Sequence, residues 1–349
     1  MISLVQKLSQ DGPTIRKSMD SRAAALCTSS RQRPRRISIA FVNSMCGAAF
    51  AAAERQYLTL LAAAGYGLDL EIRLYALLTD RGNTDGRDDR YLALADLWDS
   101  DPDALIVTGT EPRTADLAKE SYWCDLKSLV DWARSNAISA IWSCLAAHAA
   151  VRCLDGILRR PLSRKCCGVY SCDFQGKHSL LNRLCSPVRV QHSRWNELDA
   201  AELRAAGYQI LTQSAAAGVD MFIKRENALF VFFQGHPEYE GDTLLREYRR
   251  DVGRYLRYES DIYPAVPENC FDSDGIAALL AFEHRTRARR HATLLAELPL
   301  VKPCSFGDCC GASARRIYRN WLSLVSEKKS LRSSTPLVVP HAFARHPLE

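Results

Sequence analysis

Short segments that are apolar throughout alternate along the chain with longer segments whose apolar residues recur every three or four positions. The first pattern predicts buried strands, and the second predicts helices. Strands are expected at residues 36–45, 68–77, 104–110 and 137–143, and helices at residues 47–67, 90–103 and 122–136 and from residue 145 onward. This alternation favours an α/β fold in which helices flank a mostly parallel sheet.

The pattern changes in the second half of the chain. A strand is expected at 165–172, antiparallel strands within 209–240 and a helix at 242–258. Beyond residue 272 the signal weakens to two basic helices at 283–298 and 313–329. We therefore divide the chain into three parts: an irregular basic arm at 1–35, one α/β domain at 36–272, and a helical C-terminal extension with its tail at 273–349.

The composition is that of a globular protein with a buried core. Of the 349 residues, 47% are hydrophobic and 25% are charged, and the formal net charge is +6. Part of that charge lies in SSRQRPRR at 29–36, which we interpret as a solvated arm rather than a nucleic-acid-binding element. No apolar stretch is long enough for a membrane span, and the chain begins without a signal-peptide core. We expect a cytoplasmic protein that binds neither nucleic acid nor membrane.

The thirteen cysteines are odd in number and scattered, which is typical of reduced thiols in a cytoplasm. Cys304, Cys309 and Cys310 lie close together in the sequence. They lack the two spaced Cys/His pairs that a structural zinc site needs. The sequence therefore predicts no metal site.

One cysteine occupies a special position. The stretch AISAIWSCLAAHAAV at 137–151 passes from a strand-forming run into an alanine-rich helical run, and Cys144 is the joint. A side chain on such a turn projects from the sheet edge. There the free N–H groups and positive dipole end of the next helix can lower a thiol pKa and stabilise an oxyanion. This predicts a cysteine nucleophile. The alternative, a small thiol buried in the core, stays open on this stretch alone.

A thiolate nucleophile needs a base, and the base needs an orienting partner. His236 and Glu238 in GHPEYE follow the apolar strand ALFVFFQ, at a spacing that lets the carboxylate reach the imidazole. Ligands collect at the carboxyl ends of parallel strands, so this loop, the Cys144 turn and the loop VTGTEPR are expected to converge. The alternative is an exposed loop histidine beside a surface glutamate. His148, one helical turn after Cys144, is expected to pack.

Taken together, these motifs resemble the homoserine O-acyltransferases of methionine biosynthesis, the O-succinyltransferase/O-acetyltransferase family. The resemblance covers most of residues 36–272 in order and implies a class I glutamine-amidotransferase-like, flavodoxin-like fold. It rests on seven segments: NSMCGAAFAAAERQY, LIVTGTEPR with its following YW, the Cys144 turn, KCCGVY, QHSRW, QGHPEYEGDTLLREYRRDV and VPENCF.

In that family a cysteine accepts the acyl group from acyl-CoA, and the hydroxyl of homoserine then attacks the thioester. The resemblance implies no cofactor beyond acyl-CoA as substrate, and we expect a homodimer. It implies six site residues: Cys144 as nucleophile, His236 as general acid/base, Glu238 as its orienting partner, Lys165 and Ser193 as substrate contacts, and Arg250 as the clamp on the amino acid's carboxylate.

The loop after the Thr-Gly pair bears on the choice of acyl group in this family, and Arg113 occupies the relevant position. An arginine can pair with the free carboxylate of a succinyl group, so we expect succinyl-CoA as donor and L-homoserine as acceptor. The chain departs from the family pattern at Cys46, Leu145 and His148. Acetyl-CoA as donor and serine as acceptor therefore stay open.

Two other classes of protein are alternatives. The first is an amidotransferase or hydrolase on the same fold, but Trp-Ser-Cys-Leu-Ala lacks the glycines of the Gly-x-Cys-x-Gly elbow that such glutaminases carry. The second is a non-catalytic protein that binds CoA or an amino acid. The presence of Cys144, His236 and Glu238 argues against it.

Overall fold

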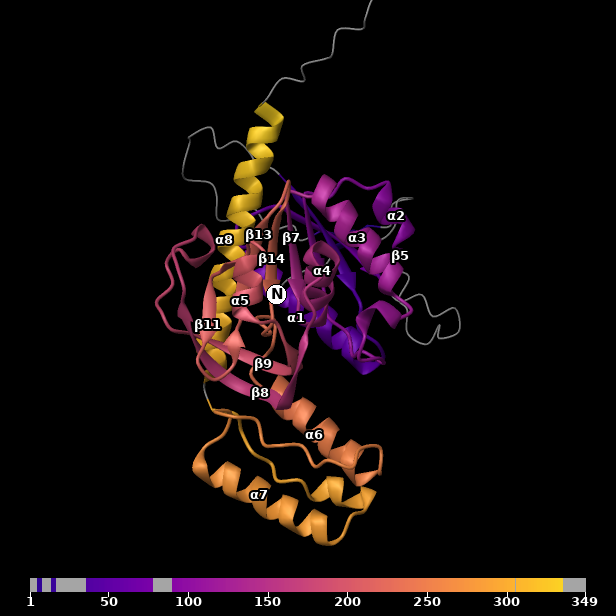
Figure 1. The fold of residues 1–349 in the computed structure, drawn as a ribbon, viewed down its shortest axis with the longest axis vertical. Helices are drawn as coiled ribbons and strands as arrows, with labels where there is room; N and C mark the ends of the chain where they lie inside the picture. Colours follow the sequence, from indigo (N-terminus) through magenta and orange to yellow (C-terminus); the bar gives the residue numbers. More distant parts are fainter. Residues whose placement is uncertain (1–4, 8–13, 17–35, 78–89, 305, 335–349) are drawn as a thin grey trace, which may run out of the picture.

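The computed structural model describes residues 5–7, 14–16, 36–77, 90–304 and 306–334 (Figure 1). Within these residues a ten-stranded sheet has the order β1-β2-β4-β3-β6-β7-β14-β13-β10, with β5 paired to β4. Its strands are β1 (Val5–Lys7), β2 (Thr14–Arg16), β3 (Ile37–Asn43), β4 (Leu70–Ala76), β5 (Tyr91–Ala93), β6 (Ala104–Val107), β7 (Ser139–Ser143), β10 (Gln209–Ile210), β13 (Met221–Arg225) and β14 (Leu229–Phe233). The central run β4-β3-β6-β7-β14 is parallel throughout.

Helices cover both faces of this sheet, which confirms the predicted α/β fold. Side chains of β14 alternate between the faces: Phe230 and Phe232 join one core cluster, and Val231 and Phe233 join the other. One face is covered by α3 (Trp123–Asn136), α4 (Leu145–Asp155) and α5 (Ala200–Ala205), and the other by α1 (Ala48–Ala64) and α8 (Phe306–Ser334). Burial on both faces explains why the strands are apolar runs without polar alternation.

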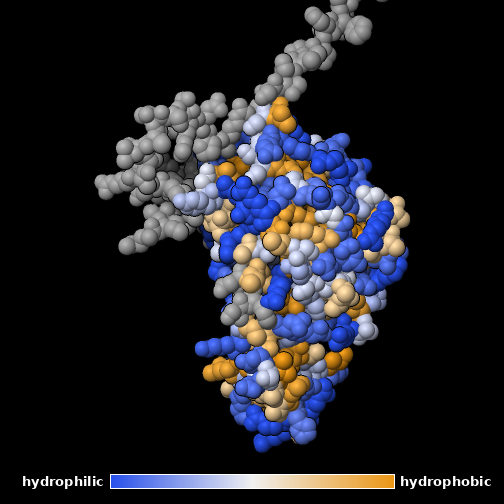
Figure 2. Space-filling view, turned by 90° about the vertical axis from the view of Figure 1, so that its left-hand side faces the viewer, coloured by the Kyte–Doolittle hydropathy of each residue, from blue (hydrophilic) through white to orange (hydrophobic). Residues whose placement is uncertain are grey.

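Two smaller units extend this body. A second sheet has the order β12-β11-β8-β9, built from β8 (Arg160–Phe174), β9 (Val188–Glu197), β11 (Thr212–Ser214) and β12 (Gly218–Val219). A helical lobe at the bottom of Figure 1 comprises α6 (Thr243–Leu256), α7 (Ser273–Ala288) and η4 (Ala292–Glu297), which share a core of their own. On this lobe hydrophobic residues reach the surface (Figure 2), and Leu280 and Leu300 are exposed. The described helices include none long and apolar enough to cross a membrane.

The predicted helix at 90–103 is wrong in its first half. Tyr91–Ala93 form strand β5 parallel to β4, and the helix α2 (Ala95–Trp98) has four residues. Tyr91 Oη donates to Glu54 Oε2 at 3.1 Å and accepts from Asn43 Nδ2 at 3.2 Å, so the strand is fixed by side chains of the neighbouring elements. Hydrophobic periodicity cannot predict this strand, because these hydrogen bonds join residues 37 and 48 positions apart in the sequence.

Both predicted flanking parts contribute to the main body. Within the arm at 1–35, which the sequence analysis treats as irregular, β1 and β2 instead lengthen the sheet at the edge of β4; the rest of the arm lies outside the described residues. Helix α8 is no peripheral extension, because Tyr318, Trp321 and Val325 are fully buried against the sheet. Trp321 Nε1 donates to Ser139 Oγ of β7 at 2.9 Å. The C-terminal helix therefore completes the core of the α/β domain.

Candidate active site

Cys144 lies between the last residue of β7 and the first residue of α4, as predicted. Its backbone has φ 51° and ψ −113°, a conformation that residues other than glycine rarely adopt. The Cys144 amide donates to Phe233 O at the end of β14 at 2.7 Å, which fixes the turn to the neighbouring strand. The thiol is partly exposed. Such a strained turn costs about 1–3 kcal/mol and presents a nucleophile above the sheet edge.

The first turn of α4 supplies backbone donors beside the thiol. The first bond within the helix runs from His148 N to Cys144 O at 3.2 Å, so the amides that precede His148 are available to a ligand. Gly109, in the loop after β6, lies against this turn: a Cβ built on it would be 3.1 Å from Leu145 N and 3.4 Å from Cys144 Cβ. Because Gly109 has no side chain, the space beside the amide of Leu145 stays open for a substrate oxygen.

Gly109→Ala is expected to lower kcat about 10- to 100-fold, since the added methyl group would crowd the amide of Leu145, the predicted oxyanion donor. The measurement is steady-state acyl transfer together with thermal unfolding. Gly176→Ala is the control, because a Cβ there would meet only Gln209 Nε2, at an ordinary contact distance of 3.8 Å. An unchanged kcat in the Gly109 variant would contradict this role for the loop.

His236 follows β14 and is held by a glutamate of its own loop. Its Nδ1 lies 2.8 Å from Glu238 Oε1, and both side chains are buried. Its Nε2 is buried without a hydrogen-bond partner at standard geometry. Burial alone would lower the pKa of His236, but the Glu238 carboxylate and the Cys144 sulfur outweigh burial and raise it well above the ordinary value. The structure thus brings together the three residues predicted as a triad, in the order Cys144–His236–Glu238.

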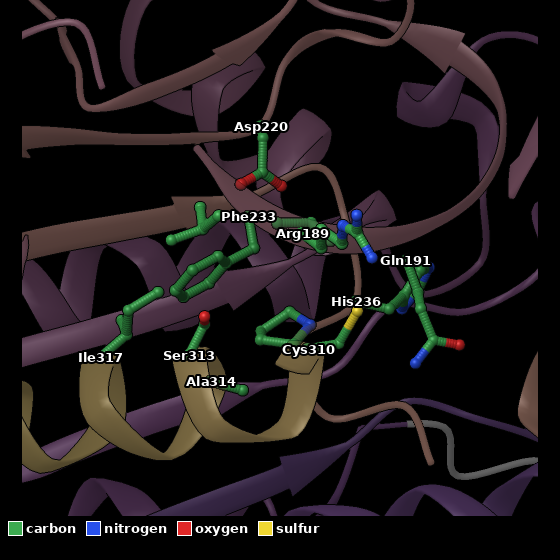
Figure 3. A pocket seen from close by; sticks show the side chains of 12 residues that line it. Arg189, Gln191, Asp220, Phe233, His236, Cys310, Ser313, Ala314 and Ile317 are labelled. Atoms are coloured by element: carbon green, nitrogen blue, oxygen red, sulfur yellow. The ribbon is translucent and has the colours of Figure 1, made fainter. Parts of the chain in front are cut away.

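Gly235, which precedes His236, lies in a tightly packed position that has no room for a side chain. A Cβ on Gly235 would lie 2.6 Å from Asp220 Oδ1 and 2.9 Å from His192 Nε2. A small cavity adjoins this region (Figure 3). It is lined by residues of β9, Phe233 at the end of β14, the first turns of α8 with Cys310, Asp220 between β12 and β13, and His236. Helix α8 and the loop that carries His236 therefore lie next to each other, since both line this cavity.

Two buried tyrosines lie in the surroundings of Glu238. Tyr57 comes from α1 and Tyr318 from α8, and Glu238 Oε2 is buried without a hydrogen bond. Burial first, and then the charge of Glu238, raise the pKa of both phenols well above the ordinary value. Both phenols therefore stay protonated at neutral pH and are suited to donate hydrogen bonds to the carboxylate.

Lys165 and Ser193, predicted as substrate contacts, belong to a polar cluster beside His236. Lys165 Nζ lies 2.8 Å from Asp251 Oδ2, and Ser193 Oγ donates to Glu247 Oε2. Tyr239 links this cluster to the histidine: its hydroxyl donates to Glu247 Oε1 at 2.7 Å, and its ring stacks on that of His236 with centroids 4.1 Å apart. In this structure Lys165 pairs with carboxylates rather than with the Cys144 thiol.

Arg250 and Arg113, the two predicted carboxylate binders, lie on different elements, α6 and the loop after β6. The half-exposed Arg250 on α6 pairs with Asp251 at 2.8 Å. Arg113 is exposed on the loop after β6, where its amide donates to the buried Glu120 Oε1 at 2.7 Å. That loop is joined to α6 by Arg254, whose guanidinium binds Glu111 through two hydrogen bonds of 3.0 Å.

Arg159 binds the loop after β6, and the sequence analysis did not single it out. It lies between α4 and β8, and its Nη2 donates to the carbonyls of Thr114 and Ala115 at 3.1 and 3.0 Å. The only sequence signal is an arginine pair, Arg159 and Arg160, after the helix that begins at Cys144. Most arginine pairs of this kind are solvated, so the signal is too weak for a prediction.

His148 packs in the interior, as predicted. It is buried, its Nε2 lies 2.9 Å from Gln234 Oε1, and burial lowers its pKa to about 3. Among the described residues, no group of three or more His, Cys, Asp or Glu side chains could hold a metal ion.

Comparison with known proteins shows which family the chain matches. The family model described as homoserine O-succinyltransferase matches residues 15–296. The homoserine O-succinyltransferase of Rhodopseudomonas palustris is 45% identical over 296 residues, which are 83% of this chain and 89% of that protein. The one from Methylorubrum extorquens is 41% identical over 305 residues, 85% of this chain and 89% of that protein.

Similar solved structures are more distant in sequence. A glutamine amidotransferase from Methylobacillus flagellatus has 13% identity and a TM-score of 0.48, with 84% of this chain and 95% of that chain covered. A glutamine amidotransferase from Thermotoga maritima has 12% identity and a TM-score of 0.44, with 83% and 98% covered.

Proposed function

Because the chain belongs to the homoserine O-succinyltransferase family, we propose that it transfers the succinyl group of succinyl-CoA to the hydroxyl of L-homoserine. The observation that carries the proposal is the Cys144–His236–Glu238 arrangement at the start of α4. A thiol, an imidazole and a carboxylate in this order are the parts of a covalent acyl-transfer site.

In the first half-reaction, the Cys144 thiolate attacks the carbonyl carbon of the acyl-CoA thioester. The carbonyl oxygen becomes an oxyanion that the amide of Leu145 and the dipole of α4 stabilise. The bond between the carbonyl carbon and the CoA sulfur then breaks, and the departing CoA thiolate takes the proton held on His236. The raised pKa of His236 favours this, because it keeps the imidazolium available beside the thiolate.

In the second half-reaction, neutral His236 accepts the proton of the homoserine hydroxyl while the oxygen attacks the thioester on Cys144. The carbon–sulfur bond breaks, O-succinylhomoserine leaves, and the thiolate and imidazolium are restored. Arg250 would bind the carboxylate of homoserine, and Lys165 and Ser193 would contact the substrate. The acidic partners Glu247 and Asp251, which neutralise this cluster before substrate binds, support a site for a zwitterionic amino acid.

A panel of donors and acceptors tests the proposal. Succinyl-CoA and acetyl-CoA are each combined with L-homoserine, L-serine and water, and products are identified by mass. O-succinylhomoserine is expected as the main product. Faster transfer from acetyl-CoA would assign the chain to acetyl transfer instead, and release of ammonia from glutamine in a parallel assay would favour an amidotransferase.

A further inference from the structure

We infer that Arg159 binds the second carboxylate of the succinyl group while that group is attached to Cys144. The inference rests on the proposed function and assigns its donor specificity to a residue outside the triad. Arg159 lies in the connection from α4 to β8, next to the loop that carries Arg113, and its side chain is half-buried.

The guanidinium of Arg159 lacks a full set of partners. Its Nη2 donates to the carbonyls of Thr114 and Ala115, but its Nε is buried without a hydrogen bond. A buried N–H left unpaired costs about 1–3 kcal/mol, so native proteins rarely retain one unless something else binds there. The other terminal nitrogen, Nη1, makes no hydrogen bond within the described residues, so a carboxylate can accept from it in a charge-assisted hydrogen bond.

Other cations around the site are paired with carboxylates. Lys165 and Arg250 bind Asp251, and Arg254 binds Glu111. Arg159 makes no ion pair within 4 Å in the part of the chain that the structure describes, although the charge of Glu120 acts on it. The Oε1 atom of Glu120 already accepts the amides of Arg113 and Thr114. The charge of Arg159 is therefore available to a ligand.

Arg159 binds the loop that lies against the nucleophile: it donates to Thr114 O at 3.1 Å, and a Cβ on Gly109 of the same loop would lie 3.4 Å from Cys144 Cβ. Burial lowers the pKa of Arg159, and the groups that oppose this effect are Tyr122, Glu120 and Cys144. Succinyl and acetyl groups on the sulfur differ only in that the succinyl chain carries a further CH₂–COO⁻ unit. A cation near the far end of the acyl chain can pair with the carboxylate of the succinyl group but has no such partner in an acetyl group. It therefore favours succinyl-CoA over acetyl-CoA.

The test is the ratio of kcat/KM for succinyl-CoA to that for acetyl-CoA. Arg159→Gln is expected to lower kcat/KM for succinyl-CoA about 100-fold and that for acetyl-CoA less than about 3-fold. Arg159→Lys keeps the charge and should retain part of the preference. The matched control is Arg160→Gln, because the exposed Arg160 pairs with Asp199 and Glu202 on the surface. It should leave the ratio unchanged.

A second measurement does not depend on turnover. Cys144 is alkylated with iodoacetate, which carries a carboxylate, and with iodoacetamide, which is neutral. Arg159→Gln should slow alkylation by iodoacetate several-fold and leave iodoacetamide unaffected. This preference would persist even if succinyl-CoA proved not to be the donor, so the two proposals fail separately.

Two results would overturn the inference. An equal loss with both donors and both reagents would mean that Arg159 only holds the Thr114–Ala115 loop in place. A shift in donor ratio with Arg113→Gln but none with Arg159→Gln would place the carboxylate at the exposed loop position.

Discussion

Replacing Cys144 with alanine is expected to lower kcat for acyl transfer by on the order of 10⁴-fold or more. The sulfur is the atom that carries the acyl group, and the remaining amides of α4 cannot form a covalent intermediate. The direct measurement is the intact mass of the protein after mixing with succinyl-CoA in the absence of acceptor. The natural protein should gain the mass of one succinyl group, and Cys144→Ala should gain none.

Cys153→Ala is the matched control for this experiment. Cys153 lies on the same helix, and partial burial raises its pKa to about 11, so it remains a thiol at neutral pH. The control should acquire the succinyl group at the normal rate. Labelling of the Cys144 variant, or loss of labelling in the Cys153 variant, would rule out Cys144 as the acyl carrier.

The second large effect is expected from Glu238→Gln, which should lower kcat about 10³-fold. The amide keeps the shape of the side chain but removes the negative charge that orients and stabilises the imidazolium at 2.8 Å. Glu240→Gln is the control, because Glu240 lies two residues away in a half-exposed ion pair with Arg55. A drop of the same size in both variants would indicate a general disturbance of the loop.

The pH profile separates the charge effect from loss of structure. Since the pKa of His236 is raised, activity that needs its imidazolium is lost only as the pH rises through that value. In Glu238→Gln the largest raising cause is gone while burial still lowers the pKa. The alkaline limb of kcat/KM should therefore move to lower pH. A limb that stays in place would mean that Glu238 does not set the protonation of His236.

The C-terminal helix shows how tertiary structure extends a site beyond its motifs. The sequence analysis places α8 in an extension, since its apolar positions could fit any packed helix. In the structure, Tyr318 of α8 joins Tyr57 of α1 in the surroundings of Glu238, and Cys310 lines the cavity behind His236. Tyr318 lies 80 positions after Glu238 in the sequence, and Tyr57 lies 181 positions before it, so a local sequence pattern cannot predict these contacts.

Local sequence by itself determined most of the elements that build the centre of the fold and pointed to the residues of the predicted triad. Short apolar runs such as LFVFF, rich in β-branched and aromatic residues, favour buried strands, and a cysteine between a strand-forming and a helix-forming run is placed at the turn. His236 and Glu238 are two residues apart, so their contact is a local property of the loop.

Tertiary structure alone decided which groups surround this triad and which charges remain available. Arg250 pairs with its sequence neighbour Asp251, but only the tertiary fold brings Lys165 of β8 to the same carboxylate of α6. No sequence motif marks Arg159. Its position is fixed by hydrogen bonds to backbone carbonyls of a loop some 45 residues earlier in the chain. The physical reason is that burial and charge pairing depend on which distant segments fold together, whereas secondary structure depends mainly on neighbours in sequence.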